Sequence, residues 1–222
     1  ILEIGAGTGG TTAHLLPYLG QAEYVFTDIS PLFLAKAEER FSDYPNFSFK
    51  RLDIEQSVEA QGFGCGDYDV VIAANVLHAT ADVTRVLENV RSLLTPGGQL
   101  VLLEGTQPLL WLDLIFGMTE GWWKRPTHPL LSVAKWQQHL QMAGFSNAMP
   151  LIPSEKTGNS SLELPQSIII ATQLSEPAQK ANWLILAEPN AELGEPLSQK
   201  LEGELVWIKD VSSLTETLSL GN

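Results

Sequence analysis

Apolar runs alternate with amphipathic stretches along most of the chain. Strands are predicted at 1–4, 23–27, 46–52, 68–74 and 99–103. Helices are predicted between these strands, at 9–19, after the Ser30-Pro31 start, and at 82–94. This alternation is typical of βαβ units, so the sequence predicts an α/β domain with a doubly wound, mostly parallel sheet.

The pattern loosens after the fifth predicted strand. We expect a short apolar helix at 109–118 and a shaped loop rich in Trp, Pro and Gly at 119–131. A helix at 132–143 and a late strand at 167–172 follow. The stretch at 153–164 is expected to connect the two arms of a terminal hairpin.

A polar segment at 173–180 divides the chain. It separates a main domain at 1–172 from a partial β-α-β segment at 181–222. The predicted elements of this segment are 183–187, 193–201 and 205–208. Because so short a segment cannot bury a core alone, we expect it to pack on the main domain or on partners outside this chain.

Charge and cysteine content narrow the class of protein. The chain has 13 Lys and Arg against 26 Asp and Glu, a net charge of −13, which disfavours nucleic acid and anionic membrane as partners. No stretch is apolar enough to span a bilayer. A single cysteine, Cys65, excludes an internal disulfide and favours a reducing, cytoplasmic compartment. The four histidines and this cysteine have no metal-ligand spacing, so no metal is predicted.

A glycine-rich turn follows the first strand. The run Glu3–Gly10 reads Glu-Ile-Gly-Ala-Gly-Thr-Gly-Gly and leads into a helix, as in turns where a nucleotide approaches the backbone closely. Asp28 ends the next strand, 21 residues after Gly7, where an acid can accept hydrogen bonds from both ribose hydroxyls. The turn and this acid together predict an adenosine-containing cofactor.

The glycines fit two cofactor patterns. They match the dinucleotide pattern G-x-G-x-x-G from Gly5 and the S-adenosylmethionine (SAM) pattern E-x-G-x-G-x-G from Glu3. Glu3 suits a cationic amino-acid tail, Asp53 follows the third strand where it can reach an adenine amino group, and no Tyr-x-x-x-Lys pair exists. SAM is therefore favoured. The predicted cofactor-binding residues are Glu3, Gly5, Ala6, Gly7, Thr8, Gly9, Asp28, Ile29, Asp53, Ile54 and Asn75.

His78 and Glu104 follow the fourth and fifth strands. These strands are neighbours in a doubly wound sheet, about 5 Å apart, so the two side chains can meet although 26 residues separate them. A carboxylate on one imidazole nitrogen fixes the tautomer and makes the other nitrogen a better base. Such a pair can act as a general base. The alternatives are a capping or core histidine and a buried acid satisfied by backbone groups.

A loop segment contributes candidate substrate contacts. Trp122, Trp123 and His128 lie close in sequence, and the two indoles suit either an aromatic wall of a substrate channel or a cover packed on the sheet edge.

Several motifs together resemble one family, the C-methyltransferase domain of modular polyketide synthases. The residues that carry the resemblance are Leu2–Thr12, Thr27–Ser30, Asn75–Thr80, Leu103–Gly105 and Glu120–Trp123. The match covers about 1–172. It implies a class I methyltransferase fold with seven mostly parallel strands and an antiparallel terminal hairpin.

The resemblance also implies a reaction. The domain would methylate the α-carbon of a β-ketoacyl thioester held on an acyl carrier protein, beside neighbouring polyketide synthase domains. His78 and Glu104 would form the base, and SAM would leave as S-adenosylhomocysteine (SAH). Because the chain begins without Met inside a strand pattern, we expect a fragment that lacks the family's N-terminal helical lid. Residues 181–222 resemble the start of a ketoreductase structural subdomain.

Other functions remain open at this point. The alternatives are methylation of an oxygen or nitrogen on a small molecule, a catalytically silent scaffold domain in a megasynthase, and a nucleotide-dependent oxidoreductase. Carrier proteins are themselves usually acidic, so docking on this acidic chain would need a local basic or apolar patch. Lys124 and Arg125 are the candidates for a basic patch.

Overall fold

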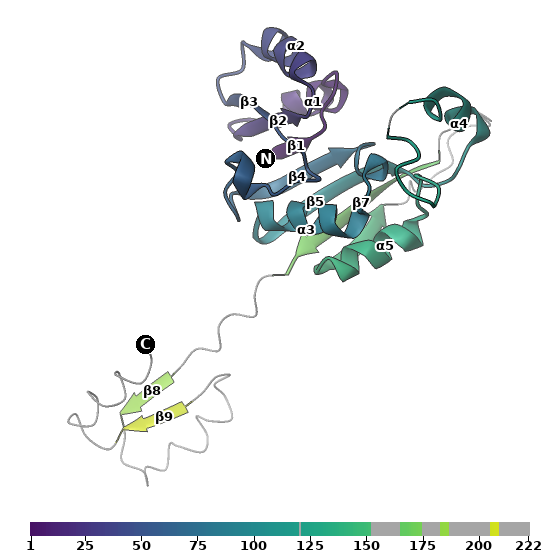
Figure 1. The fold of residues 1–222 in the computed structure, drawn as a ribbon. Coiled ribbons are helices and arrows are strands. Elements are labelled where there is room, and N and C mark those ends of the chain that lie inside the picture. Colours follow the sequence, from purple (N-terminus) through teal and green to yellow (C-terminus); the bar gives the residue numbers. More distant parts are fainter. Residues whose placement is uncertain (120, 152–164, 175–182, 187–204, 209–222) are drawn as a thin grey trace. The chain divides into compact units, whose positions relative to one another are not determined.

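A computed structural model describes residues 1–119, 121–151, 165–174, 183–186 and 205–208. The chain divides into two compact units, Ile1–Leu174 and Ser175–Asn222 (Figure 1). No helix within the described ranges combines the length and the apolar character that crossing a membrane requires.

The first unit is built around one sheet. Its strands are β1 (Leu2–Ile4), β2 (Tyr24–Asp28), β3 (Phe47–Arg51), β4 (Tyr68–Ala74), β5 (Leu94–Gly105), β6 (Phe145–Leu151) and β7 (Gln166–Gln173). Its α-helices are α1 (Gly10–Leu15), α2 (Pro31–Phe41), α3 (Val83–Leu93), α4 (Leu110–Phe116) and α5 (Val133–Met142). Three short 3₁₀ helices are η1 (Leu16–Tyr18), η2 (Glu59–Gln61) and η3 (Leu77–Ala79).

The seven strands lie in the order β3-β2-β1-β4-β5-β7-β6. The first five are parallel, whereas β7 runs antiparallel to both β5 and β6. This arrangement confirms the predicted class I methyltransferase fold, with its antiparallel hairpin at the end. The carboxyl ends of the parallel strands meet at one edge of the sheet, where ligands bind in doubly wound folds.

Two apolar clusters support that edge. The larger includes Leu87 of α3, Trp136 of α5 and Leu102 of β5, all fully buried. A smaller cluster packs Ala37 and Phe41 of α2 on Phe26 of β2. Both clusters include residues of strands whose ends carry candidate site residues. Core packing therefore fixes the positions of those strand ends.

The first predicted helix is shorter than expected. The periodicity predicts 9–19, but α1 ends at Leu15 and continues as the 3₁₀ turn η1. Pro17 lies in that turn, and its ring nitrogen has no proton to donate to the carbonyl four residues earlier. Ser30 is the N-cap residue of α2 as predicted, although its side chain makes no capping hydrogen bond.

The fifth strand is longer than predicted at both ends. It starts at Leu94, which pairs with Tyr68, and runs to Gly105. Its end is set by β7, because Glu104 pairs with Ser167 and Gly105 with Gln166. The antiparallel partner therefore makes Glu104 part of the sheet, which the local pattern of β5 did not indicate.

Strand β6 is the first arm of the predicted terminal hairpin, an arm whose bounds the sequence pattern does not predict. It starts at the buried Phe145, then alternates partly buried and exposed positions, and it pairs with β7 across an irregular register. The predicted hairpin connection at 153–164, the predicted helix at 193–201 and most of the predicted linker lie outside the described residues. In the second unit, β8 (Trp183–Leu186) and β9 (Leu205–Ile208) pair in parallel and match predicted strands.

Candidate active site

The turn after β1 holds three glycines in left-handed backbone conformations. Their φ angles are +59° at Gly5, +56° at Gly7 and +73° at Gly9. A Cβ at Gly5 would lie 2.4 Å from Val76, and one at Gly9 would lie 2.7 Å from Phe41, so neighbouring side chains exclude larger residues there. A Cβ at Gly7 would meet only the Gly5 carbonyl oxygen, at 3.9 Å. The turn is therefore tightly packed on both sides and open in its middle.

Asp28 ends β2 beside this turn. Its carboxylate accepts hydrogen bonds from the Gly7 N–H at 2.9 Å and the Ser30 N–H at 2.8 Å. Within the turn, the Ala6 N–H donates to the Thr27 carbonyl at 2.9 Å. A carboxylate with one backbone donor on each oxygen has acceptor capacity left for the two hydroxyls of a ribose. Asp28 thus fixes the turn and remains able to bind a nucleoside.

Glu3 lies beneath the turn. It is buried, and its Oε2 accepts hydrogen bonds from the Thr12 hydroxyl and, at 2.6 Å, from the Tyr24 hydroxyl. Burial raises the pKa of the Glu3 carboxyl, while these two hydrogen bonds act in the opposite direction. Burial and the nearby Glu3 also raise the pKa of Tyr24. The described contacts of Glu3 connect β1, α1 and β2, and its role in cofactor binding stays a prediction.

The remaining predicted cofactor residues extend along the same edge. Ile29 follows Asp28 and is 52% exposed, and its contact with the cofactor stays a prediction. Asp53 accepts a hydrogen bond from the Glu55 N–H at 3.0 Å and donates its own N–H to Gln61 at 2.8 Å. Ile54 is buried in the large core cluster. We call the turn 5–9, Asp28 and Asp53 the cofactor edge.

The cofactor edge fits the adenosine part of SAM. Its turn has open space above Gly7 rather than a filling side chain, and Asp28 presents a carboxylate at a strand end next to that space. No cluster of three or more His, Cys, Asp or Glu in the described part of the chain is arranged to hold a metal ion.

His78 and Glu104 meet at the ends of β4 and β5. His78 Nδ1 lies 2.7 Å from Glu104 Oε2, with the carboxylate fully buried and the imidazole 11% exposed. Glu104 Oε1 also accepts the backbone N–H groups of Val76, Leu77 and His78, at 3.1, 2.9 and 3.3 Å. One carboxylate therefore positions both the ring and the backbone of η3. The sequence-based expectation that these residues meet is confirmed by the geometry.

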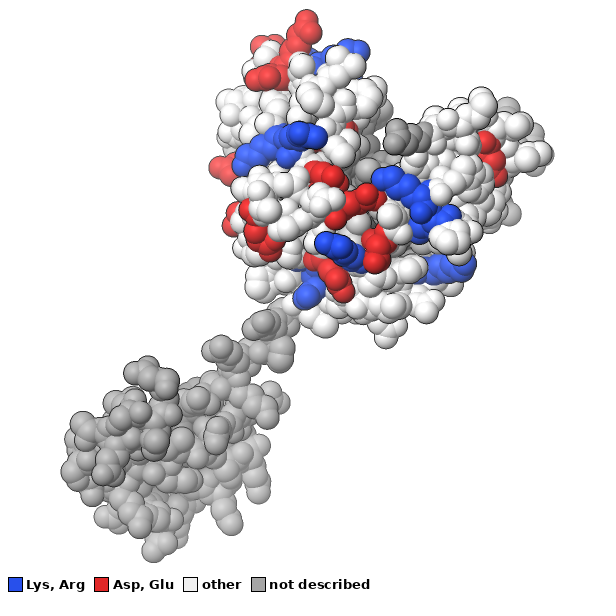
Figure 2. Space-filling model, viewed as in Figure 1, with Lys and Arg blue, Asp and Glu red and all other residues white. Residues whose placement is uncertain are grey.

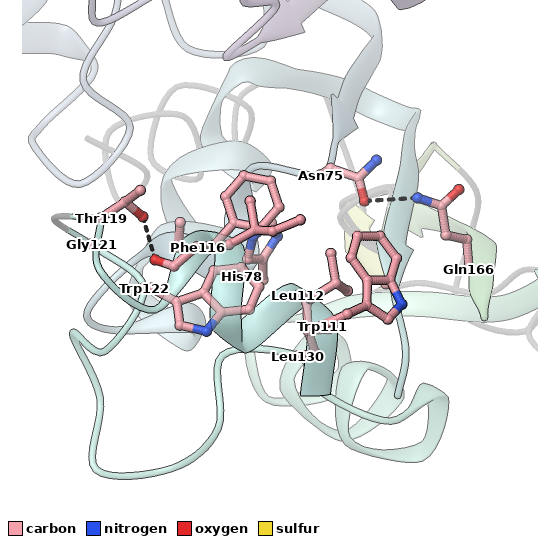
Figure 3. Close-up of a pocket in the computed structure, with 13 residues that line it drawn as sticks. Asn75, His78, Trp111, Leu112, Phe116, Thr119, Gly121, Trp122, Leu130 and Gln166 are labelled. Atoms are coloured by element: carbon pink, nitrogen blue, oxygen red, sulfur yellow. Dashed lines mark hydrogen bonds between the residues drawn. The ribbon is translucent and has the colours of Figure 1, made fainter. Parts of the chain in front are cut away.

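A cavity of about 530 Å³ opens beside His78. Figure 3 shows the imidazole among aromatic and aliphatic side chains from α4 and the loop after it. The lining residues with side chains are Asn75, His78, Ala79, Trp111, Leu112, Ile115, Phe116, Thr119, Trp122, Leu130 and Gln166. We call this the acceptor cavity, because its size and apolar walls suit a small organic substrate.

Trp122 lies against the ring of His78, the candidate base. Its indole packs edge-on against the His78 ring, with centroids 5.6 Å apart, and stacks on Phe116 at 5.4 Å. Its Nε1–H donates to Asp113 Oδ1 at 3.0 Å. Trp122 is buried and belongs to the cavity wall, as one of the two readings of the loop expects.

His128 supports that wall from behind. The Leu130 N–H donates to His128 Nδ1 at 3.0 Å, so the ring proton is on Nε2, which donates to Asp113 at 3.1 Å. Trp123 packs edge-on against His128 and is 53% exposed. Neither His128 nor Trp123 lines the acceptor cavity. The structure therefore brings Trp122 to the cavity, and places the other two predicted channel residues outside it.

The candidate basic patch is already engaged within the chain. Lys124 Nζ lies 3.2 Å from Glu55 Oε2, and Arg125 donates to the carbonyl oxygens of Thr80 and Pro129 at 2.7 and 2.8 Å. Burial lowers the pKa of Arg125. Figure 2 shows basic side chains interspersed with acidic ones on this face. Arg125 thus ties the loop to η3, while Lys124 retains partial exposure.

Several cavity residues carried no signal in the sequence. Trp111, Leu112 and Ile115 lie in a predicted apolar helix, where apolar residues usually indicate core. In the structure, Trp111 and Ile115 are 44% and 57% exposed and line the cavity. Only the structure shows this exposure, which distinguishes them from core residues. Gln166 lies 91 residues from its partner Asn75, beyond any local motif.

Comparisons with known proteins agree with this geometry. Residues 2–100 match the family model described as a methyltransferase domain. A polyketide synthase-nonribosomal peptide synthetase of Aspergillus clavatus is 43% identical over 188 residues, covering 81% of this chain and 5% of that protein. The CurJ carbon methyltransferase is 48% identical with a TM-score of 0.73, covering 78% of this chain and 48% of that one. The trans-methyltransferase CalH, in complex with SAH, is 40% identical with a TM-score of 0.69, covering 78% and 50%.

The chain spans only 5% to 6% of the length of the first curated relatives that it matches, all of them large synthases. It spans about half of the two solved chains. The similarity to both solved domains covers 78% of this chain. The chain belongs to the class I SAM-dependent methyltransferases, as a carbon methyltransferase domain of the polyketide synthase type.

Proposed function

We propose that this domain methylates the α-carbon of a β-ketoacyl thioester carried on an acyl carrier protein, with His78 as the base. The observation that carries the proposal is the His78–Glu104 pair at the wall of an apolar cavity. The relatives are multidomain polyketide synthases, which supports a carrier protein and neighbouring synthase domains as partners.

The arrangement of His78 favours a base. The Glu104 carboxylate accepts a hydrogen bond from Nδ1–H, so Nε2 carries the free lone pair. Nε2 makes no hydrogen bond to any residue that the structure describes. A carbon between two carbonyl groups is acidic enough for imidazole to remove its proton once the two are held together. The electron pair of the broken C–H bond then moves onto the keto oxygen as an enolate.

The cofactor edge supplies the other reactant. Asp28 and the glycine turn would hold the adenosine part of SAM, and SAM when bound supplies an electrophilic methyl group. Val76 links the two regions, because it packs against Gly5 and immediately precedes the η3 turn that holds His78. The base is thereby fixed relative to the cofactor edge through a contact of side chain on backbone.

The acceptor cavity suits a carbon nucleophile. Its walls around His78 include Trp122, Phe116 and Leu130, so an enolate formed there is shielded from water. Exclusion of water slows reprotonation of the carbon and leaves methylation as the productive outcome. An oxygen or nitrogen acceptor would need no such shield.

The test uses two readouts on the same chain. The first is the mass of a β-ketoacyl carrier protein after incubation with SAM. The second is exchange of the substrate's α-proton with D₂O in the absence of SAM. We expect a gain of one methyl group and exchange above the buffer background, and both should be lost in His78→Ala. Calorimetry should show that SAM binds His78→Ala within about twofold of the original chain.

Each result separates the alternatives. Methylation with no enzyme-dependent exchange, and no loss in His78→Ala, would remove the base assignment. SAM binding without methylation or exchange would point to another acceptor or to a silent domain.

A further inference from the structure

Two amide side chains face each other at the acceptor cavity. Gln166 Nε2 donates a hydrogen bond to Asn75 Oδ1 at 3.3 Å (Figure 3). Asn75 follows β4, and Gln166 begins β7. Thr119, the hydroxyl-bearing residue among the described lining residues, donates a hydrogen bond to the Phe116 carbonyl oxygen at 2.6 Å. Asn75 and Gln166 are therefore the polar pair of a wall that is otherwise mostly apolar.

The hydrogen bond fixes which end of the Asn75 amide is free. A side-chain amide has one acceptor oxygen and one donor nitrogen. Since Oδ1 accepts from Gln166, the Nδ2 group is the end of the amide that makes no hydrogen bond to any described residue. Gln166 thus selects a donor, rather than an acceptor, at this point of the wall.

The backbone of Asn75 is held as firmly as its side chain. Its φ is +53°, a left-handed conformation that Asn tolerates better than most residues, and its N–H donates to the Leu103 carbonyl at 2.7 Å. The next three residues donate their N–H groups to Glu104. Asn75 and His78 therefore belong to one short segment whose position is fixed from both ends.

Proton removal at a carbon next to a carbonyl creates charge that this wall must stabilise. The electron pair moves from carbon to oxygen, and a donor placed at that oxygen lowers the barrier. No lysine or arginine is among the residues lining the described cavity. The wall needs a neutral donor, and Asn75 Nδ2 has the required chemistry beside the base.

We propose that Asn75 donates a hydrogen bond to the keto oxygen of the substrate as enolate charge develops, and that Gln166 is a positioning residue that orients the Asn75 amide. The proposal rests on the proposed function. His78 takes the α-proton, the C–H electron pair becomes the enolate, and the Asn75 proton stays on its nitrogen throughout.

The experiment measures α-proton exchange of a β-ketoacyl carrier protein in D₂O without SAM. Asn75→Gly removes the amide while keeping a residue that adopts positive φ without strain. We expect exchange to fall by about 100-fold, the usual loss for one oxyanion donor. SAM affinity should stay within about twofold.

The chain contains a matched control for this variant. Asn147, in β6, is the other described non-glycine residue with positive φ, at +50°, and it does not line the acceptor cavity. Asn147→Gly should exchange like the original chain. Thermal melting of both variants checks that each folds.

Gln166 tests the orientation directly. The carboxylate introduced by Gln166→Glu accepts only, so it draws Asn75 Nδ2 toward itself and turns Oδ1 to the cavity. Exchange should then fall nearly as far as in Asn75→Gly. Gln166→Ala leaves the amide free to rotate and should cost about tenfold or less. Equal rates in the two Gln166 variants would overturn the positioning role.

The outcomes distinguish failure of this proposal from failure of the proposed function on which it rests. Unchanged exchange in Asn75→Gly, with His78→Ala inactive, overturns the donor role and leaves the base intact. Weakened SAM binding with unchanged exchange would make Asn75 a cofactor residue, as the sequence predicts, rather than an enolate donor. If the original chain promotes no exchange, the proposed function fails and the donor role fails with it.

Discussion

The cofactor edge and the acceptor cavity meet in one site but are built differently. The cofactor edge uses backbone conformation and strand-end acids, with Gly7 and Asp28 joined by one hydrogen bond. The acceptor cavity uses side chains from α4, η3, β7 and the loop between α4 and α5. A backbone site can be specified by a short motif, whereas a side-chain cavity depends on how distant segments pack.

Both regions nevertheless use the same device. Asp28 accepts backbone N–H groups on each side of its strand end, and Glu104 accepts three N–H groups and an imidazole. Asp28 thereby fixes the glycine turn, whereas Glu104 fixes the imidazole of the proposed base. The following changes test whether the two regions work as separate units.

The largest effect is expected from Glu104→Gln. The new amide can still accept the η3 N–H groups through its oxygen, but its NH₂ group would face His78 Nδ1 and favour the wrong tautomer. Methylation should fall on the order of 10³- to 10⁴-fold, the size seen when a triad carboxylate is made an amide. SAM affinity, measured by calorimetry, should hardly change. Equal turnover would mean that the carboxylate serves only the backbone.

Asp28→Ala should give the reverse pattern. It removes a charged acceptor from the ribose position, so SAM affinity should fall by about 10- to 100-fold. Proton exchange without SAM should be retained, because the acceptor cavity is unaltered. Asp28→Asn keeps an oxygen that can accept from one N–H group, so its SAM affinity should lie between those of Asp28→Ala and the original chain. Loss of exchange in Asp28→Ala would show that the regions are coupled.

Asp113→Ala tests how the cavity wall is held. The Asp113 carboxylate accepts hydrogen bonds from Trp122 Nε1–H and from His128 Nε2–H, so its loss frees the indole that packs on His78. We expect kcat/KM to fall about tenfold, because the Trp122 indole no longer holds the His78 ring in a fixed orientation. Asp113→Asn retains an acceptor oxygen and should recover most of the rate. No difference between the two variants would remove this role from Asp113.

The smallest effect is expected from Glu3→Gln and concerns stability. Burial raises the pKa of Glu3 above 4.5, so the folded chain holds this proton to higher pH than the unfolded chain. Stability contributed by this group is therefore lost as pH rises from 4.5 through the raised value. The variant should melt higher than the original chain at pH 8, and the gain should shrink toward pH 5.

The size of that gain follows from the melting behaviour of domains this large. Each kcal/mol corresponds to about 2–4 °C in Tm. SAM affinity of the same Glu3→Gln variant tests whether Glu3 also binds the cofactor. Affinity within about twofold would fit its contacts to Thr12 and Tyr24, and a larger loss would show that Glu3 reaches the cofactor.

Local patterns predicted most strands of the sheet, but they predicted some strand and helix ends poorly. Strand β4 has the predicted bounds, since a run of apolar residues at 68–74 leaves no ambiguity. Helix α1 is shorter than the predicted 9–19 because of Pro17. This cause is local and lies in the sequence itself. The end of β5 could not be read from its own residues, because pairing with β7 sets it.

The candidate site divides in the same way. The glycine turn and Asp28 were expected together because they lie 21 residues apart in one βαβ unit. The meeting of His78 with Glu104 was expected from the order of neighbouring strands. Trp123 and His128 follow the same loop as Trp122 but lie behind the cavity wall, since a loop's path is set by contacts such as the Arg125 hydrogen bonds.

The sequence by itself determined the fold class, and it predicted the glycine turn with Asp28 and the meeting of His78 with Glu104. These depend on periodicity, on glycine conformation and on strand ends, all of which act over short distances along the chain. Only the tertiary structure decided that Gln166 faces Asn75, that Asp113 holds Trp122, and that exposed apolar residues of α4 form a wall. Such contacts depend on side chains packed between distant segments, and no local pattern encodes them.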